Sequence, residues 1–191
     1  GATASGAQAP ADLVAEVVKV HGRLDAVISN DEFPAIRAPV DEAKLEDMRN
    51  GLEAMVVRPF ALAQAAVPQM KQQGGGRILF MTSAAPLRGL ANYGMYATAR
   101  GATNAMTVSL AKELAPHNIV VNAIAPNYME NPSYFPPELL ANQAAMSKML
   151  KNIPLGRLGK PHEVAALVAF FAIGDCAFVT GHVIPIAGGW A

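Results

Sequence analysis

The sequence contains a single cysteine, Cys176, among its 191 residues. One thiol cannot form a disulfide bond within the chain, and proteins without disulfides are typical of a reducing compartment. We therefore expect a cytoplasmic protein. Its length is sufficient to bury a substantial core in one domain, residues 1–191.

An excess of either sign of charge is also missing. Fifteen Lys and Arg residues balance fifteen Asp and Glu residues, so the chain has no electrostatic affinity for nucleic acid or for an anionic membrane surface. No run of 18 apolar residues is present, and no signal peptide opens the chain, so we expect no membrane segment. Charged residues make up only 16% of the sequence, which contains nine methionines. This composition leaves apolar surface to cover and favours an oligomer.

The sequence also lacks histidine and cysteine residues at the spacing that a metal site requires. The histidines are scattered, and no cysteine cluster accompanies them. We interpret all of them as structural or surface residues and predict no metal site; they are His21, His117, His162 and His182.

Apolar runs alternate with helical patterns along the chain, which predicts an α/β fold with a Rossmann-like, doubly wound parallel sheet and helices on both faces. The expected strands are 24–29, 77–82, 119–124 and 183–186, and the expected helices are 12–21, 41–71, 95–115, 139–151 and 162–173. Helix 41–71 is expected to kink near Pro59 and Pro68.

A first strand with a glycine-rich turn is missing from this pattern. A doubly wound domain begins with that unit, and residues 1–11 do not supply it. We therefore expect the N-terminal strands, roughly 50 residues of a domain of about 250, to lie outside this sequence. The triple glycine Gly74–Gly76 precedes a strand rather than joining a strand to a helix, so we interpret it as a turn and not as a phosphate-binding loop.

Three residues around a strand end suggest chemistry. Ser83 follows the strand 77–82, and Tyr96 and Arg100 lie four residues apart at the start of a helix, where they share one face. A fixed cation one turn away favours the phenolate form of a tyrosine, and arginine cannot act as the base itself. Tyr96 would then accept a proton from a substrate oxygen held by Ser83. The alternative for the Tyr–Arg pair alone is a core tyrosine beside a solvated arginine.

This spacing resembles the short-chain dehydrogenase/reductase superfamily, in which the basic residue is ordinarily lysine. Arginine at that position resembles the halohydrin dehalogenase branch, which lost nicotinamide binding and holds a halide instead. Further similarities are Ser29-Asn30-Asp31, Pro126-Asn127-Tyr128 and Asn131-Pro132-Ser133-Tyr134-Phe135-Pro136. The resemblance covers essentially the whole sequence.

Position along the chain suggests a role for each of these segments. Asp31 follows a strand and is expected to pair with Arg100, or else to cap a turn. The loop Pro126, Asn127, Tyr128 and Met129 is expected to bind the halide through backbone N–H groups, or else to be an ordinary connection. Pro86, in a loop with Gly89 and Gly94, is expected to line the substrate pocket with Tyr134 and Phe135. The alternative for these two aromatic residues is that they hold their loop against the core. Trp190 is expected at a subunit interface or in a partner's pocket.

The function implied is cofactor-independent displacement of halide from a vicinal halohydrin to give an epoxide, with epoxide opening by small anions as the reverse reaction. The resemblance also implies a homotetramer built on helices 41–71 and 94–115. The first alternative is an NAD(P)-dependent short-chain oxidoreductase that carries arginine in place of lysine. The second is a catalytically inactive sensor or scaffold domain.

Overall fold

A four-stranded parallel sheet forms the centre of the molecule. The computed structural model describes residues 9–132 and 134–191. The strands are β1 (Ala26–Ser29), β2 (Gly76–Met81), β3 (Ile119–Pro126) and β4 (Val183–Ile186), paired in the order β1-β2-β3-β4. Each pair is parallel. The predicted α/β architecture and all four predicted strands are confirmed.

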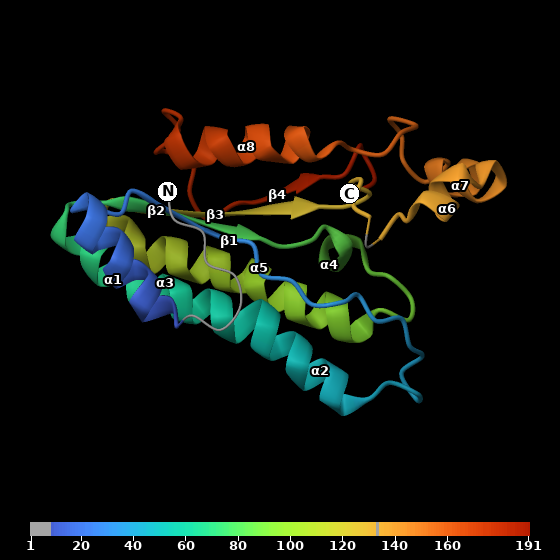
Figure 1. The fold of residues 1–191 in the computed structure, drawn as a ribbon, viewed down its shortest axis with the longest axis horizontal. Helices are drawn as coiled ribbons and strands as arrows, with labels where there is room; N and C mark the ends of the chain where they lie inside the picture. Colours follow the sequence, from blue (N-terminus) through green and yellow to red (C-terminus); the bar gives the residue numbers. More distant parts are fainter. Residues whose placement is uncertain (1–8, 133) are drawn as a thin grey trace.

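Helices cover both faces of this sheet (Figure 1). On one face lie α1 (Pro10–His21), α3 (Arg58–Gln72) and α5 (Gly94–Leu114), and α8 (Pro161–Ile173) covers the other. None of the helices in the described part of the chain has the length and apolar character that a membrane crossing needs.

Successive side chains of β2 point to opposite faces of the sheet and so contribute to the core on both faces. Ile78 and Phe80 join the cluster with α1, α3 and α5, whereas Leu79 packs with Phe171 of α8. Successive residues of a strand point to opposite faces, so a strand buried on both faces is apolar throughout. This is why 77–82 was recognisable as a continuous apolar run.

Two predicted helices are divided in the structure. In segment 41–71 the helix begins only at Leu45, and α2 (Leu45–Leu52), the π-helix η1 (Glu53–Val57) and α3 then follow one another, with Pro68 inside α3. Segment 139–151 consists of α6 (Pro137–Ala141) and α7 (Gln143–Leu150). The break there falls at Asn142, whose side chain accepts a hydrogen bond from the Ala145 N–H and so caps α7. Asparagine in this role favours a new helix start over continuation.

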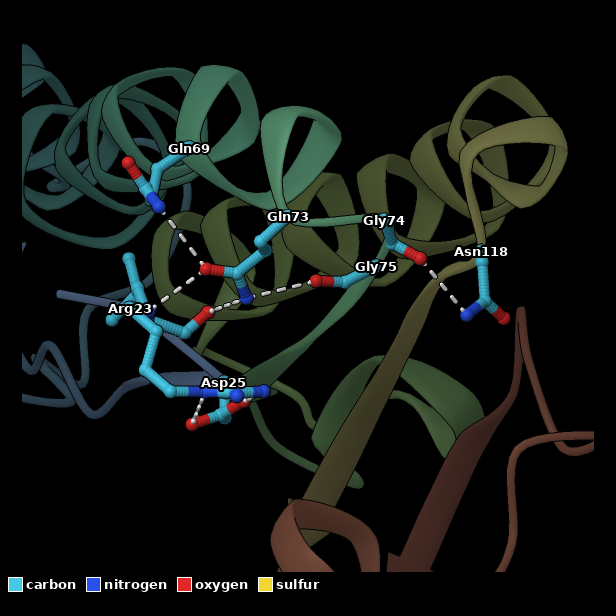
Figure 2. Close-up of polar contacts among 8 residues, drawn as sticks. Arg23, Asp25, Gln69, Gln73, Gly74, Gly75 and Asn118 are labelled. Atoms are coloured by element: carbon cyan, nitrogen blue, oxygen red, sulfur yellow. Dashed lines mark hydrogen bonds and ion pairs between the residues drawn. The ribbon is translucent and has the colours of Figure 1, made fainter.

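The amino ends of the strands are joined by a polar network (Figure 2). The Gln73 side chain accepts a hydrogen bond from the Leu24 N–H at 3.0 Å and donates to the carbonyls of Leu24 and Gly75. Asn118 donates to the Gly74 carbonyl at 3.1 Å. Gly75 has φ +149°, and a Cβ there would lie 2.6 Å from the Asn118 carbonyl oxygen. The triple glycine is therefore a tight turn, as predicted.

Candidate active site

The carboxyl end of β2 holds Ser83 in a buried position. Thr82 continues the ladder, because its N–H donates to the Ile124 carbonyl at 2.8 Å. Ser83 is 4% exposed, and its Oγ accepts a hydrogen bond from the Ala85 N–H at 3.1 Å. A serine hydroxyl has one proton and two lone pairs. The accepted bond orients the oxygen and leaves the proton available for another acceptor.

Pro86 lies in a helix rather than in the predicted loop. The short helix α4 (Ala85–Arg88) follows Ser83 directly, with Pro86 in its first turn. Proline suits the first turn because the N–H it lacks would have no helical partner there. A Cβ added at Gly101 of α5 would meet the Pro86 ring at 3.5 Å. Pro86 therefore packs towards α5.

Helix α5 brings Tyr96 and Arg100 together as the spacing predicted. The Arg100 guanidinium carbon lies 5.6 Å from the centroid of the Tyr96 ring, within the range of a cation–π interaction. Arg100 is 6% exposed. Its Nη1 donates to the carbonyls of Met81 at 2.9 Å and Asp31 at 3.1 Å, so one side chain joins α5 to the ends of two strands. Its buried Nε has no partner among the described residues.

Asp31 contacts Arg100, but through the main chain rather than through its carboxylate. The Asp31 carboxylate instead accepts a hydrogen bond from the Ser29 hydroxyl, two residues earlier. The two residues are therefore bonded to each other without an ion pair between their side chains. The reason is local: the chain leaves β1 with the Asp31 carbonyl directed at α5, and the short side chain bonds its own strand.

Hydrogen bonds within the loop after β3 and to neighbouring segments fix its conformation. The Asn127 N–H donates to the Ile186 carbonyl at 3.2 Å, and the Tyr128 N–H donates to Asn127 Oδ1 at 2.9 Å. Pro126 accepts from the Ala84 N–H. Tyr128 has φ +53°, a conformation that non-glycine residues rarely adopt. Among the main-chain N–H groups of residues 127–129, that of Met129 has no acceptor in the described part of the chain.

The same loop borders a hollow of about 350 Å³, counting the part open to solvent. Arg157 lies at its rim, but its guanidinium makes two hydrogen bonds to the Glu163 carboxylate at 2.7 and 2.8 Å. The Arg157 guanidinium holds the pKa of Glu163 at about 2, below its usual 4.5. Because this cation is already paired, it does not supply a free charge for an anion in the hollow.

Trp190 packs inside its own chain, contrary to the expected interface position. It is 6% exposed, and its ring meets that of Tyr128 edge to face with centroids 5.8 Å apart. The Arg88 guanidinium lies 5.1 Å from the indole centroid and donates to the Trp190 carbonyl at 2.7 Å. The indole therefore connects α4 with the loop after β3. The sequence could not show that the chain end folds back over this site.

Tyr134 lies near the Tyr96–Arg100 pair. Burial raises the pKa of Tyr134, the neighbouring Tyr96 phenol raises it further, and Arg100 opposes the change. The N–H groups of Tyr134 and Phe135 both donate to the Asn131 carbonyl, which folds this segment into a compact turn. Tyr134 remains 42% exposed. Ser133, part of the same predicted motif, lies outside the described residues.

A hollow of about 210 Å³, counting the part open to solvent, lies beside Tyr96. Its lining is mostly apolar: Phe33, Pro34, Ile36, Asp47, Gly51, Met55, Met95 and Tyr96. Sequence analysis missed Phe33, Gly51 and Met55. A signal was present in Pro59, because a proline inside a helical pattern disturbs the turn that precedes it. No cluster of three or more metal-ligating side chains occurs in residues 9–132 and 134–191.

Comparison with known proteins shows two kinds of similarity. A family model described as enoyl-(acyl carrier protein) reductase matches residues 4–191. The 3-oxoacyl-(acyl-carrier-protein) reductase FabG of Thermotoga maritima is 35% identical over 178 residues, which is 93% of this chain and 70% of that protein. The dehydrogenase/reductase SDR family member 4 of Homo sapiens is 30% identical over 177 residues, 93% of this chain and 63% of that protein.

Among solved structures, one named "Dehalogenation enzyme" is 54% identical with a TM-score of 0.91 and covers 95% of this chain and 75% of that one. The halohydrin dehalogenase HheC bound to ethyl (2S)-oxiran-2-ylacetate is 39% identical with a TM-score of 0.90, covering 96% and 75%. An NAD⁺-bound xylitol dehydrogenase is 32% identical with a TM-score of 0.85, covering 94% and 74%. The chain thus spans about two thirds to three quarters of the length of these relatives.

Proposed function

The chain belongs to the short-chain dehydrogenase/reductase superfamily of enzymes, and within it we propose that it is a halohydrin dehalogenase. The observation that carries the proposal is Arg100, a buried guanidinium over the Tyr96 ring that is bonded to the ends of β1 and β2. The similarity to a dehalogenation enzyme at 54% identity and to HheC supports it.

The proposed reaction begins with the substrate hydroxyl between Ser83 and Tyr96. The Ser83 hydroxyl, oriented by the Ala85 N–H, donates to the substrate oxygen. Tyr96, beside the Arg100 cation, is the proposed general base and accepts the substrate proton. The oxygen attacks the neighbouring carbon from the side opposite the halogen, a C–O bond forms as the C–halogen bond breaks, and the bonding pair leaves with the halide. The products are an epoxide and a halide ion.

The loop after β3 is the proposed halide site. Because the N–H groups of Asn127 and Tyr128 are paired within the chain, the Met129 N–H is the donor we assign to the ion. Tyr128 and Trp190 hold the loop in its unusual conformation. In reverse, a small anion at this loop would open the epoxide. Homotetramer assembly, a cytoplasmic location and the absence of a nicotinamide cofactor stay predictions.

A second candidate is an NAD(P)-dependent oxidoreductase, because the curated relatives include reductases such as FabG. The two candidates predict different cofactor behaviour. As a dehalogenase, the protein releases bromide from 2-bromoethanol without nicotinamide, and neither NAD nor NADP binds in calorimetry. Micromolar binding of either cofactor, with no bromide release, would favour the oxidoreductase.

A further inference from the structure

The helical segment beside the candidate site departs from α-helical geometry at η1. In an α-helix the carbonyl of Met55 would accept the N–H of residue 59, but that residue is proline and has no N–H. The backbone widens into a π-helix over Glu53–Val57, a distortion that is frequent at functional sites. The Met55 carbonyl accepts a hydrogen bond from the Thr103 hydroxyl at 2.5 Å.

Thr103 makes this contact a buried link between η1 and the helix that carries Tyr96 and Arg100. It is 1% exposed. Its hydroxyl lies 3.4 Å from the Ala99 carbonyl within its own helix, farther than from Met55. A hydroxyl has one proton, and the shorter distance assigns it to Met55. The position of η1 is therefore coupled to the position of α5.

Met55 lines the hollow beside Tyr96 together with its neighbours Gly51 and Phe33. A Cβ added at Gly51 would lie 3.5 Å from Met55 Cε and 3.5 Å from Phe33 Cδ1. This is ordinary van der Waals contact, so a methyl group fits without strain. It would nevertheless occupy the space between two residues that line the hollow.

We propose that Gly51 and Met55 form the specificity-determining wall of the site, against which a short aliphatic substituent on the alcohol carbon lies. Thr103 is the positioning residue that holds this wall relative to Tyr96. The proposal rests on the proposed function for the identity of the reacting alcohol. The wall itself is independent of the leaving group.

Gly51→Ala tests the wall with a matched pair of substrates. The kcat/KM for 1-bromo-2-butanol, whose ethyl group reaches the wall, falls about 10-fold or more, whereas that for 2-bromoethanol stays within about 2-fold, because one methyl group in a tight pocket changes selectivity by roughly 10- to 200-fold. The melting temperature rises, since alanine is the better helix former. An unchanged ratio between the two substrates overturns the proposal.

Thr103→Val and Thr103→Ser separate positioning from simple packing. Valine keeps the shape and removes the hydroxyl, so KM for 1-bromo-2-butanol rises more than KM for 2-bromoethanol. Serine keeps the hydroxyl and restores the wild-type ratio. A valine variant that loses thermal stability while keeping the wild-type ratio contradicts the positioning role.

Binding of diols tests the wall without any turnover. Ligand-observed NMR titrations of 1,2-butanediol and 1,2-ethanediol give their Kd values for wild type and Gly51→Ala. We expect wild type to prefer the butanediol and the variant to lose that preference. If wild type releases no bromide, the proposed function fails while this ratio still tests the wall. The absence of a wild-type preference, or a ratio that Gly51→Ala leaves unchanged, overturns the inference.

Discussion

The two ends of the sheet differ in how completely their polar groups are satisfied. At the amino end, the amide of Gln73 bonds both main-chain groups of Leu24 and also Gly75 (Figure 2). At the carboxyl end, the buried Nε of Arg100 has no partner among the described residues. An unpaired buried polar group costs free energy.

The difference assigns separate roles to the two ends. The hydrogen bonds of Gln73 and Asn118 at the amino end fix the strands to the turns that precede them and contribute stability. The carboxyl end keeps a cation, a hydroxyl proton and a phenol available, which is expected where a substrate completes the bonding. Substitutions at the amino end should therefore lower stability with little effect on turnover. Substitutions at the carboxyl end should lower turnover with little effect on stability.

The largest effect is expected for Tyr96→Phe. This change removes the proposed base, so halide release falls by about 10²-fold or more, while the melting temperature changes little because Tyr96 is not fully buried. Tyr93→Phe, three residues earlier and also partly exposed, is the matched control and should keep its activity. Near-normal activity of Tyr96→Phe would contradict the assignment of the base.

Gly75→Ala should be the most damaging of the amino-end changes. Its Cβ would lie 2.6 Å from the Asn118 carbonyl oxygen at φ +149°, and such strain costs about 2–3 kcal/mol. The control is Gly74→Ala, whose φ is also positive but whose Cβ would meet nothing within 4 Å. Urea denaturation measures both. Equal losses would show that the carbonyl contact is unimportant.

The same substitution, arginine to lysine, can be made at both ends of the sheet: Arg100→Lys at the carboxyl end and Arg77→Lys near the amino end. Arg77 also donates from one Nη1 to two carbonyls, those of Phe171 and Gly174, but near the amino end. Lysine lacks the planar fork, so Arg100→Lys should misplace the cation and lower kcat about 10- to 100-fold with an altered pH profile. Arg77→Lys should lower stability alone. A similar loss of kcat in both would remove the distinction between the ends.

The smallest effect concerns the pH dependence of the Arg157–Glu163 pair. The pKa of Glu163 is lowered from 4.5 to about 2, so the folded state favours the carboxylate. Its contribution to stability is complete above about pH 4.5 and is lost as the pH falls towards 2. The difference in unfolding free energy between wild type and Glu163→Gln should shrink across that range. A difference independent of pH would exclude this linkage.

Sequence reasoning succeeded where the physical signal is local, in a run of apolar residues or in a helical spacing. The continuous apolar run of β2 and the four-residue spacing of Tyr96 and Arg100 predicted the strand and the shared helix face, and both are confirmed. It did not specify which of a residue's polar groups makes a contact. Asp31 meets Arg100 by its carbonyl instead of its carboxylate, and no spacing rule distinguishes the two.

Contacts between residues far apart in the sequence could not be predicted either. Trp190 lies 62 positions after Tyr128, yet their rings are in contact, and the sequence pattern does not encode that return. The π-helix before Pro59 was predicted only as a kink, and the Thr103 hydroxyl that bonds its Met55 carbonyl comes from another helix. The four strands could be predicted from local sequence, whereas these contacts depend on the tertiary structure.

The reverse reaction tests the central claim most directly. The protein is incubated with 1,2-epoxybutane and sodium bromide at mildly acidic pH without nicotinamide, and bromo-alcohol formation is followed by gas chromatography. The account predicts enzyme-dependent formation of bromobutanol that Tyr96→Phe abolishes and Tyr93→Phe preserves. No ring opening by wild type, together with oxidation of a simple alcohol when NAD or NADP is added, would contradict it.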